Sequence, residues 1–135
     1  MRVAVRYHSR TGNTKKVAHA IANAAGVIAL DLSVPLAEKV DVLFLGSAMY
    51  AGGVDESVKK FIARNREKIG TLYAFSTAAV AASTYKQVKK LAAESGVQLS
   101  EKEFHCRGAF SLLHRSRPDE DNLRAAAAFA RDVLK

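Results

Sequence analysis

Hydroxyl and amide side chains are concentrated in one short stretch, residues 9–14, which reads Ser-Arg-Thr-Gly-Asn-Thr. An apolar run typical of a strand, residues 3–7, precedes it, and a helical pattern begins near Asn13. The first N–H groups of a helix have no partner within the helix, and the helix dipole puts partial positive charge at the same end. Because a phosphate is stabilised there, we predict a phosphate-binding loop. Its expected contacts are Ser9, Arg10, Thr11, Gly12, Asn13 and Thr14.

Spacing excludes several better-known phosphate loops. Gly12 is the only glycine before Gly26, so neither the nucleotide-triphosphate loop nor the three-glycine dinucleotide fingerprint fits. A phosphatase loop needs five residues between its cysteine and arginine, whereas the only cysteine, Cys106, directly precedes Arg107. A response-regulator receiver needs acidic residues ending its first strand and an aspartate ending its third, and this chain has neither. An ordinary turn that caps a helix remains the alternative interpretation of residues 9–14.

Five apolar runs alternate with helical patterns along the chain. Such alternation predicts an α/β fold with a parallel sheet and right-handed crossovers. Residues 33–39 have room for at most a helical turn or two, and glycines from 46 to 53 break the third run. Strands are expected at residues 3–7, 27–32, 40–45, 71–75 and 103–110, and the apolar stripes of helices at 17–25, 54–62, 85–92 and 123–134.

The expected fold brings three loops to one edge. In open sheets of this kind, ligands bind beyond the carboxyl ends of the strands, where the strand order reverses. For the order 2-1-3-4-5 that point lies between the first and third strands. The phosphate loop follows the first strand, the glycine-rich stretch follows the third, and a loop of small residues, 76–82, follows the fourth.

These motifs resemble those of the flavodoxin family. Residues 9–14 look like its FMN-phosphate loop, Ser/Thr-x-Thr-Gly-Asn-Thr, and residues 46–52 are similar to the Gly-Ser-Pro-x-Tyr-x-Gly loop that lies on the flavin ring. Residues 104–120 resemble a stretch common in short members from anaerobic bacteria. The resemblance implies a flavodoxin-like three-layer sandwich of order 2-1-3-4-5 and one FMN-binding domain spanning residues 1–135.

The resemblance also implies the residues that contact the flavin. Met49 and Tyr50 would offer a polarisable thioether and an aromatic face to the ring. The alternative is a glycine-rich turn in which both side chains fill the core. The small residues after the fourth strand would leave the other ring face open to a substrate, unless Tyr85 or a partner covers it. The expected ring contacts are Ser47, Ala48, Met49, Tyr50, Ala51 and Gly52, and then Ser76, Thr77, Ala78, Ala79 and Val80.

Composition limits the cellular compartment and the classes of partner that we expect for the protein. The single cysteine excludes an internal disulfide and fits a reducing compartment. No stretch approaches the ~20 apolar residues of a membrane span, and the first strand begins too early for a signal peptide, so we expect a cytoplasmic protein. The net charge of +8 would attract acidic partners, although most cationic side chains fit solvated helix faces. We expect no specific nucleic-acid site.

The sequence leaves three functions open. The first is an FMN-binding electron carrier that serves a redox partner protein. The second is an FMN-dependent oxidoreductase of the quinone-reductase or protoporphyrinogen-oxidase kind, using NAD(P)H or a quinone. The third is a flavin-free binding module that uses its basic surface. Because a flavin supplies the redox chemistry, we predict no catalytic residue, and the histidines and the cysteine show no metal-ligand spacing.

Overall fold

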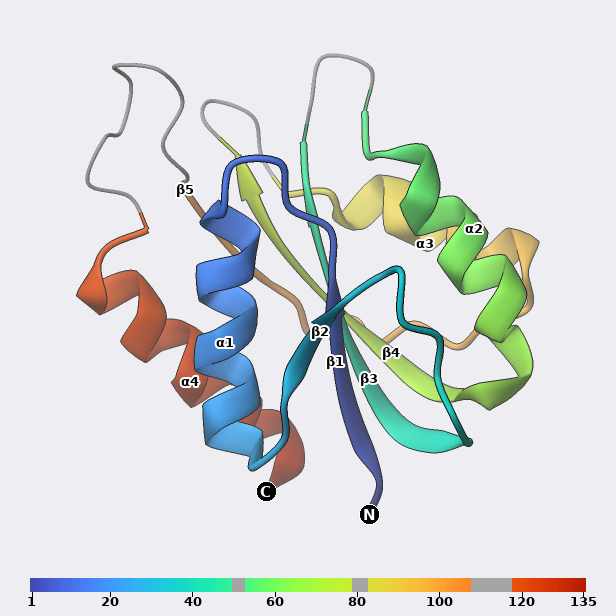
Figure 1. The fold of residues 1–135 in the computed structure, drawn as a ribbon, viewed down its shortest axis with the longest axis horizontal. Coiled ribbons are helices and arrows are strands. Elements are labelled where there is room, and N and C mark those ends of the chain that lie inside the picture. The colour runs from blue at the N-terminus through green and yellow to red at the C-terminus, as the bar shows by residue number, and fades with distance from the viewer. Residues whose placement is uncertain (50–52, 79–82, 108–117) are drawn as a thin grey trace.

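The computed structural model describes residues 1–49, 53–78, 83–107 and 118–135. Strands and helices alternate along these residues, as the apolar runs predict (Figure 1). The strands are β1 (Val3–Tyr7), β2 (Ala29–Asp31), β3 (Val40–Ala48), β4 (Ile69–Ala78) and β5 (Phe104–Arg107). The helices are α1 (Asn13–Ala25), α2 (Glu56–Asn65), the 3-10 turn η1 (Arg66–Lys68), α3 (Tyr85–Glu94) and α4 (Glu120–Leu134).

All five strands form one parallel sheet of order β2-β1-β3-β4-β5, which confirms the predicted topology. The strand order reverses at β1, because β2 is added on one side of β1 and β3 on the other. The carboxyl ends of β1 and β3 lie side by side, with Tyr7 paired to Gly46. This is the edge at which an open parallel sheet binds ligands.

Helices cover both faces of the sheet (Figure 1). The helices α1 and α4 pack on one face over a cluster that includes Val5, Phe44 and Phe75. The helices α2 and α3 pack on the other face over a cluster that includes Leu43, Leu45 and Leu72. Strands between two helical layers bury both faces, which explains their nearly continuous apolar runs.

The central strands are longer at their carboxyl ends than the sequence predicts. Glycine was expected to end the third strand at residue 45, but the β3–β4 ladder continues to the pair of Ala48 with Thr77. The expected loop from residue 76 is likewise wrong for Ser76, Thr77 and Ala78, which belong to β4. The reason is tertiary, because adjacent strands supply backbone hydrogen bonds that keep a polar segment extended. The second strand, in contrast, is shorter than expected, and residues 33–39 form no helix.

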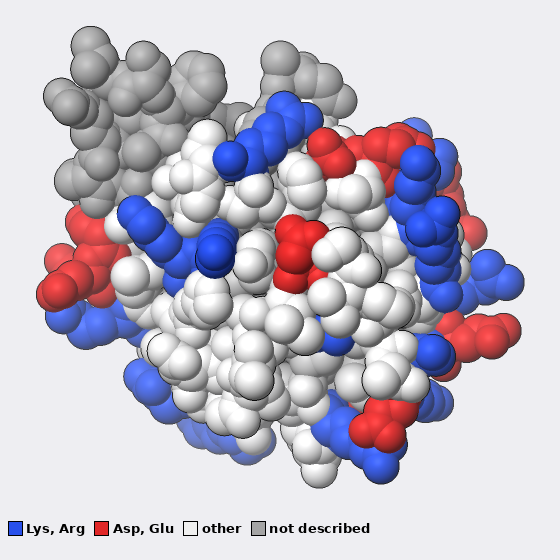
Figure 2. Space-filling view, in the orientation of Figure 1, with Lys and Arg blue, Asp and Glu red and all other residues white. Residues whose placement is uncertain are grey.

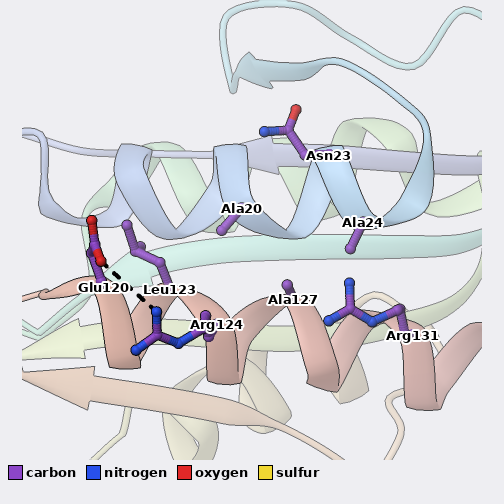
Figure 3. A pocket seen from close by; sticks show the side chains of 8 residues that line it. All are labelled: Ala20, Asn23, Ala24, Glu120, Leu123, Arg124, Ala127 and Arg131. Carbon is purple, nitrogen blue, oxygen red and sulfur yellow. Dashed lines mark ion pairs between the residues drawn. The ribbon is translucent and has the colours of Figure 1, made fainter.

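A shallow groove of about 410 Å³ runs between α1 and α4 on the outer surface of the molecule. Figure 3 shows Ala20 and Ala24 of α1 across from Ala127 of α4, with an ion pair between Glu120 and Arg124 at one end. None of the predicted site residues lines this groove. In the part of the chain that the structure describes, no helix is long and apolar enough to cross a bilayer.

Candidate functional site

The phosphate loop joins β1 to α1 in a conformation that requires glycine. Gly12 has φ +91°, and no atom lies within 4 Å of the place where a Cβ would sit. The Ser9 Oγ accepts a hydrogen bond from the Gly12 N–H at 2.9 Å, so the hydroxyl proton of Ser9 is still available to a ligand. The N-cap residue of α1 is Gly12, which has no side chain with which to cap the helix. The first turn carries the exposed cations Lys15 and Lys16 and no acidic residue, so this helix end lacks the anionic side chains that usually stabilise it.

Two of the predicted loops are joined through a buried contact between hydroxyl groups. Thr14, on the first turn of α1, and Thr77, near the end of β4, place their Oγ1 atoms 2.8 Å apart. Both residues are buried, at 1% and 2% exposure. A hydroxyl pair uses one proton for its mutual hydrogen bond, so the second proton can be donated elsewhere.

A second group of buried hydroxyls connects β3, β4 and α3. The Ser47 Oγ lies 2.8 Å from the Thr84 Oγ1, and the Thr84 N–H donates to the Ser76 Oγ at 3.2 Å. All three residues are about 1% exposed. The Ser83 Oγ accepts from the Tyr85 N–H at the start of α3, whereas Thr84 bonds to both strands. Paired buried hydroxyls keep these strand ends in one arrangement, since an unpaired one would cost free energy.

Gln87 of α3 holds both sides of the loop that follows β3. Its Oε1 accepts from the Val54 N–H at 2.8 Å, and its Nε2 contacts the Met49 Sδ at 3.4 Å. The Met49 N–H also donates to the Thr77 carbonyl at 3.2 Å. The sequence analysis did not identify Gln87, because a polar residue on a helix carries no sign of a partner more than 30 positions away.

Replacing Gln87 with alanine is expected to loosen this loop. The Val54 N–H would lose a hydrogen bond worth about 1 kcal/mol, so its hydrogen exchange should be roughly fivefold faster. Amide exchange followed by NMR measures this. The exposed neighbour Lys86 supplies the control, since Lys86→Ala should leave Val54 unchanged. Equal exchange in both variants would show that Gln87 does not restrain the loop.

Asp55 links the phosphate loop to α2. Its carboxylate caps α2 by accepting from the Ser57 N–H at 3.0 Å, and it pairs with Arg10 at 3.0 Å. The His8 Nε2 lies 3.7 Å away. Hydrogen bonds from Ser57 and then from Arg10 hold the pKa of Asp55 well below its ordinary value.

Replacing Asp55 with alanine is expected to lower the free energy of unfolding by about 1 kcal/mol at neutral pH, through loss of the cap. The carboxylate titrates at lower pH in the folded chain than the ~3.9 of an unfolded aspartate, so its contribution is complete above that pH and is lost as the pH falls further. The difference between wild type and Asp55→Ala in urea denaturation should therefore shrink in acid. Asp55→Asn keeps a capping side chain and should lose less. A pH-independent difference would contradict this account.

The structure brings together part of the predicted site. Residues 9–14 and the carboxyl ends of β3 and β4 lie at one edge of the sheet, and the described contacts join them at Thr14 with Thr77 and at Met49 with Thr77. Ser47, Ser76 and Ala78 are buried strand residues, whereas Arg10 and Thr11 are exposed. Five predicted ring contacts lie outside the described residues, namely Tyr50, Ala51, Gly52, Ala79 and Val80.

Comparison with known proteins identifies the family. A family model described as the flavodoxin domain matches residues 4–112. The chain belongs to the flavodoxin domain family. An uncharacterised protein of Methanocaldococcus jannaschii is 29% identical to this flavodoxin domain over 136 residues, covering 91% of each chain.

Solved structures share the fold of this flavodoxin domain. A flavodoxin from the domain Archaea superposes with a TM-score of 0.80 at 16% identity, covering 98% of this chain and 96% of the other. Flavodoxin 2 from Bacillus cereus gives a TM-score of 0.71 at 18% identity, covering 99% and 98%. The Flv1 flavodiiron core from Synechocystis gives 0.75 at 16% identity, and the match spans 96% of this chain but 34% of that one. These similarities support a flavodoxin-like α/β fold.

Proposed function

We propose that residues 1–135 form one domain that binds FMN and transfers electrons to a redox partner. The observation that carries this proposal is the meeting of the phosphate loop with the ends of β3 and β4. The buried contact of Thr14 with Thr77 joins two of these segments, and the Met49 N–H joins the third. Membership of the flavodoxin domain family and the similar fold of two flavodoxins support it.

The donor groups of the phosphate loop fit the phosphate of FMN. The N-cap residue of α1 is a glycine, the first turn of the helix carries two lysines, and the space beside Gly12 is open among the described residues. A dianionic phosphate would receive backbone N–H groups there, together with hydroxyl protons from Ser9 and Thr11. Arg10 pairs with Asp55 across the same loop and keeps it attached to α2.

FMN, when bound, supplies the redox chemistry, and the side chains bind and orient it. The loop at residues 9–14 would hold the phosphate. Ser47 and Ser76, fixed through Thr84, would keep the two strand ends at constant separation beside the ring. Gln87 would hold Met49 against that edge. No proton transfer by a side chain is needed for these roles.

A second candidate is an FMN-dependent oxidoreductase that acts on NAD(P)H or a quinone. The observation in its favour is the net charge of +8, because positive surroundings stabilise an anionic reduced flavin and raise its potential. Small residues at the end of β4, from Ser76 to Ala78, would leave room for a substrate beside the ring.

The deciding experiment is an absorbance spectrum of the purified protein before and after addition of FMN, followed by anaerobic titration with dithionite. Flavin bands at near-equal stoichiometry would support the cofactor. Reduction in separate one-electron steps would then favour the carrier, whereas direct two-electron bleaching and steady turnover of NAD(P)H with a quinone would favour the enzyme. A protein that binds no FMN at micromolar concentrations would overturn both candidates and favour a binding module that uses the basic surface.

A further inference from the structure

A second cleft, of about 560 Å³, lies between the segment that follows β2 and the helix α2. In Figure 1 this segment crosses the front of the molecule beside α2. Leu32 and Phe61 form an apolar floor that is nearly buried, at 9% and 4% exposure, and the exposed Pro35 lines the cleft on the side of the segment that follows β2. The volume falls in the range of small-molecule sites, which are mostly apolar with a few polar groups.

Three polar side chains form hydrogen bonds to the backbone of residues 34–36, which form the outer wall of this cleft. Asn65 accepts from the Leu36 N–H at 3.0 Å, and Lys68 donates to the Leu36 carbonyl at 3.0 Å. Arg6 of β1 donates to the carbonyls of Val34 at 2.8 Å and Pro35 at 3.3 Å. The wall therefore has a defined position without a ligand, which reduces the ordering cost of binding.

Arg6 is a buried cation, at 7% exposure, directly behind this wall. Its described hydrogen bonds all go to carbonyl oxygens, and it forms no ion pair with another residue that the structure describes. Burial lowers the pKa of its guanidinium, but arginine remains protonated in proteins. A buried positive charge without a carboxylate partner is costly, and it makes the region in front of it attractive to anions.

The open side of the cleft is also cationic. Lys60 and Arg64 are four residues apart on α2 and so lie on one face of that helix, and Lys68 lines the cleft from the turn η1 that follows. Figure 2 shows Lys and Arg side chains gathered along the flank that carries α2, with a few acidic ones among them. None of these three forms an ion pair with a described residue. Among the residues that the structure describes, one carboxylate lines the cleft, that of Asp31, which accepts from the Ser33 N–H at 2.9 Å.

We propose that this cleft binds a small aromatic anion, with its ring against Pro35 above the apolar floor and its phosphate or carboxylate group on Lys60 and Arg64. Apolar surface and unpaired cations in one preformed cleft match a ligand that carries both features. The cations would bind the anionic group through charge-assisted hydrogen bonds. The lining of this site includes none of residues 9–14, and His8, which directly precedes Ser9, is the lining residue nearest to that loop in the sequence.

The test is an NMR titration of the purified protein with 2-naphthyl phosphate and, separately, with 2-naphthoate. Amide shifts should centre on residues 31–36 and 57–68, and the neutral 2-naphthalenemethanol should bind at least tenfold more weakly. The double variant Lys60→Gln with Arg64→Gln should weaken binding about tenfold or more. The double variant Lys59→Gln with Arg66→Gln is the matched control, because it removes the same charge from exposed positions that do not line the cleft.

Three results would overturn the proposal. The first is an absence of shifts in the cleft at millimolar ligand. The second is equal weakening by both double variants, which would mean attraction to the basic surface as a whole. The third is a set of shifts centred on residues 9–14, which would assign the binding to the phosphate loop. Because the titration does not require FMN, its outcome is independent of the test of the proposed cofactor.

Discussion

Replacing Thr11 and Thr14 together with valine is expected to weaken FMN binding by about 2 to 4 kcal/mol, roughly 30-fold to 1,000-fold in Kd. A hydrogen bond to a charged group is worth about 1.5 to 3 kcal/mol, and the variant removes the exposed Thr11 hydroxyl, whereas the Thr14 hydroxyl, which is already bonded to Thr77, contributes less. The buried Thr77 hydroxyl also loses its partner at Thr14, which adds to the loss. Fluorescence titration of the protein with FMN measures the dissociation constant.

The matched control is the double variant Thr11→Ser with Thr14→Ser, which keeps both hydroxyls and should stay within a few-fold of wild type. Thermal unfolding without flavin separates a binding defect from a folding defect, because Thr14 is buried. If the valine variant is folded and binds FMN as tightly as the serine variant, residues 9–14 do not hold the phosphate.

Replacing Gly46 with alanine is expected to destabilise the fold by about 3 kcal/mol, because the core leaves no room for a Cβ. The ring of Phe75 would lie 2.3 Å from the new methyl group, and the Thr14 Cγ2 would lie 2.9 Å from it. Urea denaturation followed by circular dichroism measures the change. Since the methyl group also meets Thr14, FMN affinity should fall in parallel.

A second substitution tests the cause. Phe75→Leu removes the ring that the new methyl group would meet, so the double variant should be more stable than the sum of the two single effects predicts, by about 1 kcal/mol or more. Strict additivity of the two changes would show that the ring is not the obstacle. The glycine would then be required for another reason.

A parallel sheet with right-handed crossover helices could be predicted from the alternation of apolar runs and helical patterns, whereas the strand order 2-1-3-4-5 was implied by the resemblance to flavodoxins. The end of α1 at Gly26 and the start of α4 likewise depend on residues that are close together in the sequence. Gly26 has φ +73°, and Asp119 and Asn122 form a capping box. The extension of β3 and β4 was not predictable, because Ser47 and Ser76 resemble loop residues until each is seen paired with the other.

The sequence by itself determined the fold class and the loop expected to bind phosphate, and the resemblance of its motifs to those of flavodoxins implied the strand order. Those features depend on local periodicity and on residue types within a few positions of one another. Only the tertiary structure revealed the hydrogen bond between Thr14 and Thr77 and those of Gln87 to Met49 and Val54. It also revealed that Arg6 is buried behind the cleft beside α2. These contacts join residues at least 28 positions apart, and nothing in either local sequence specifies its distant partner.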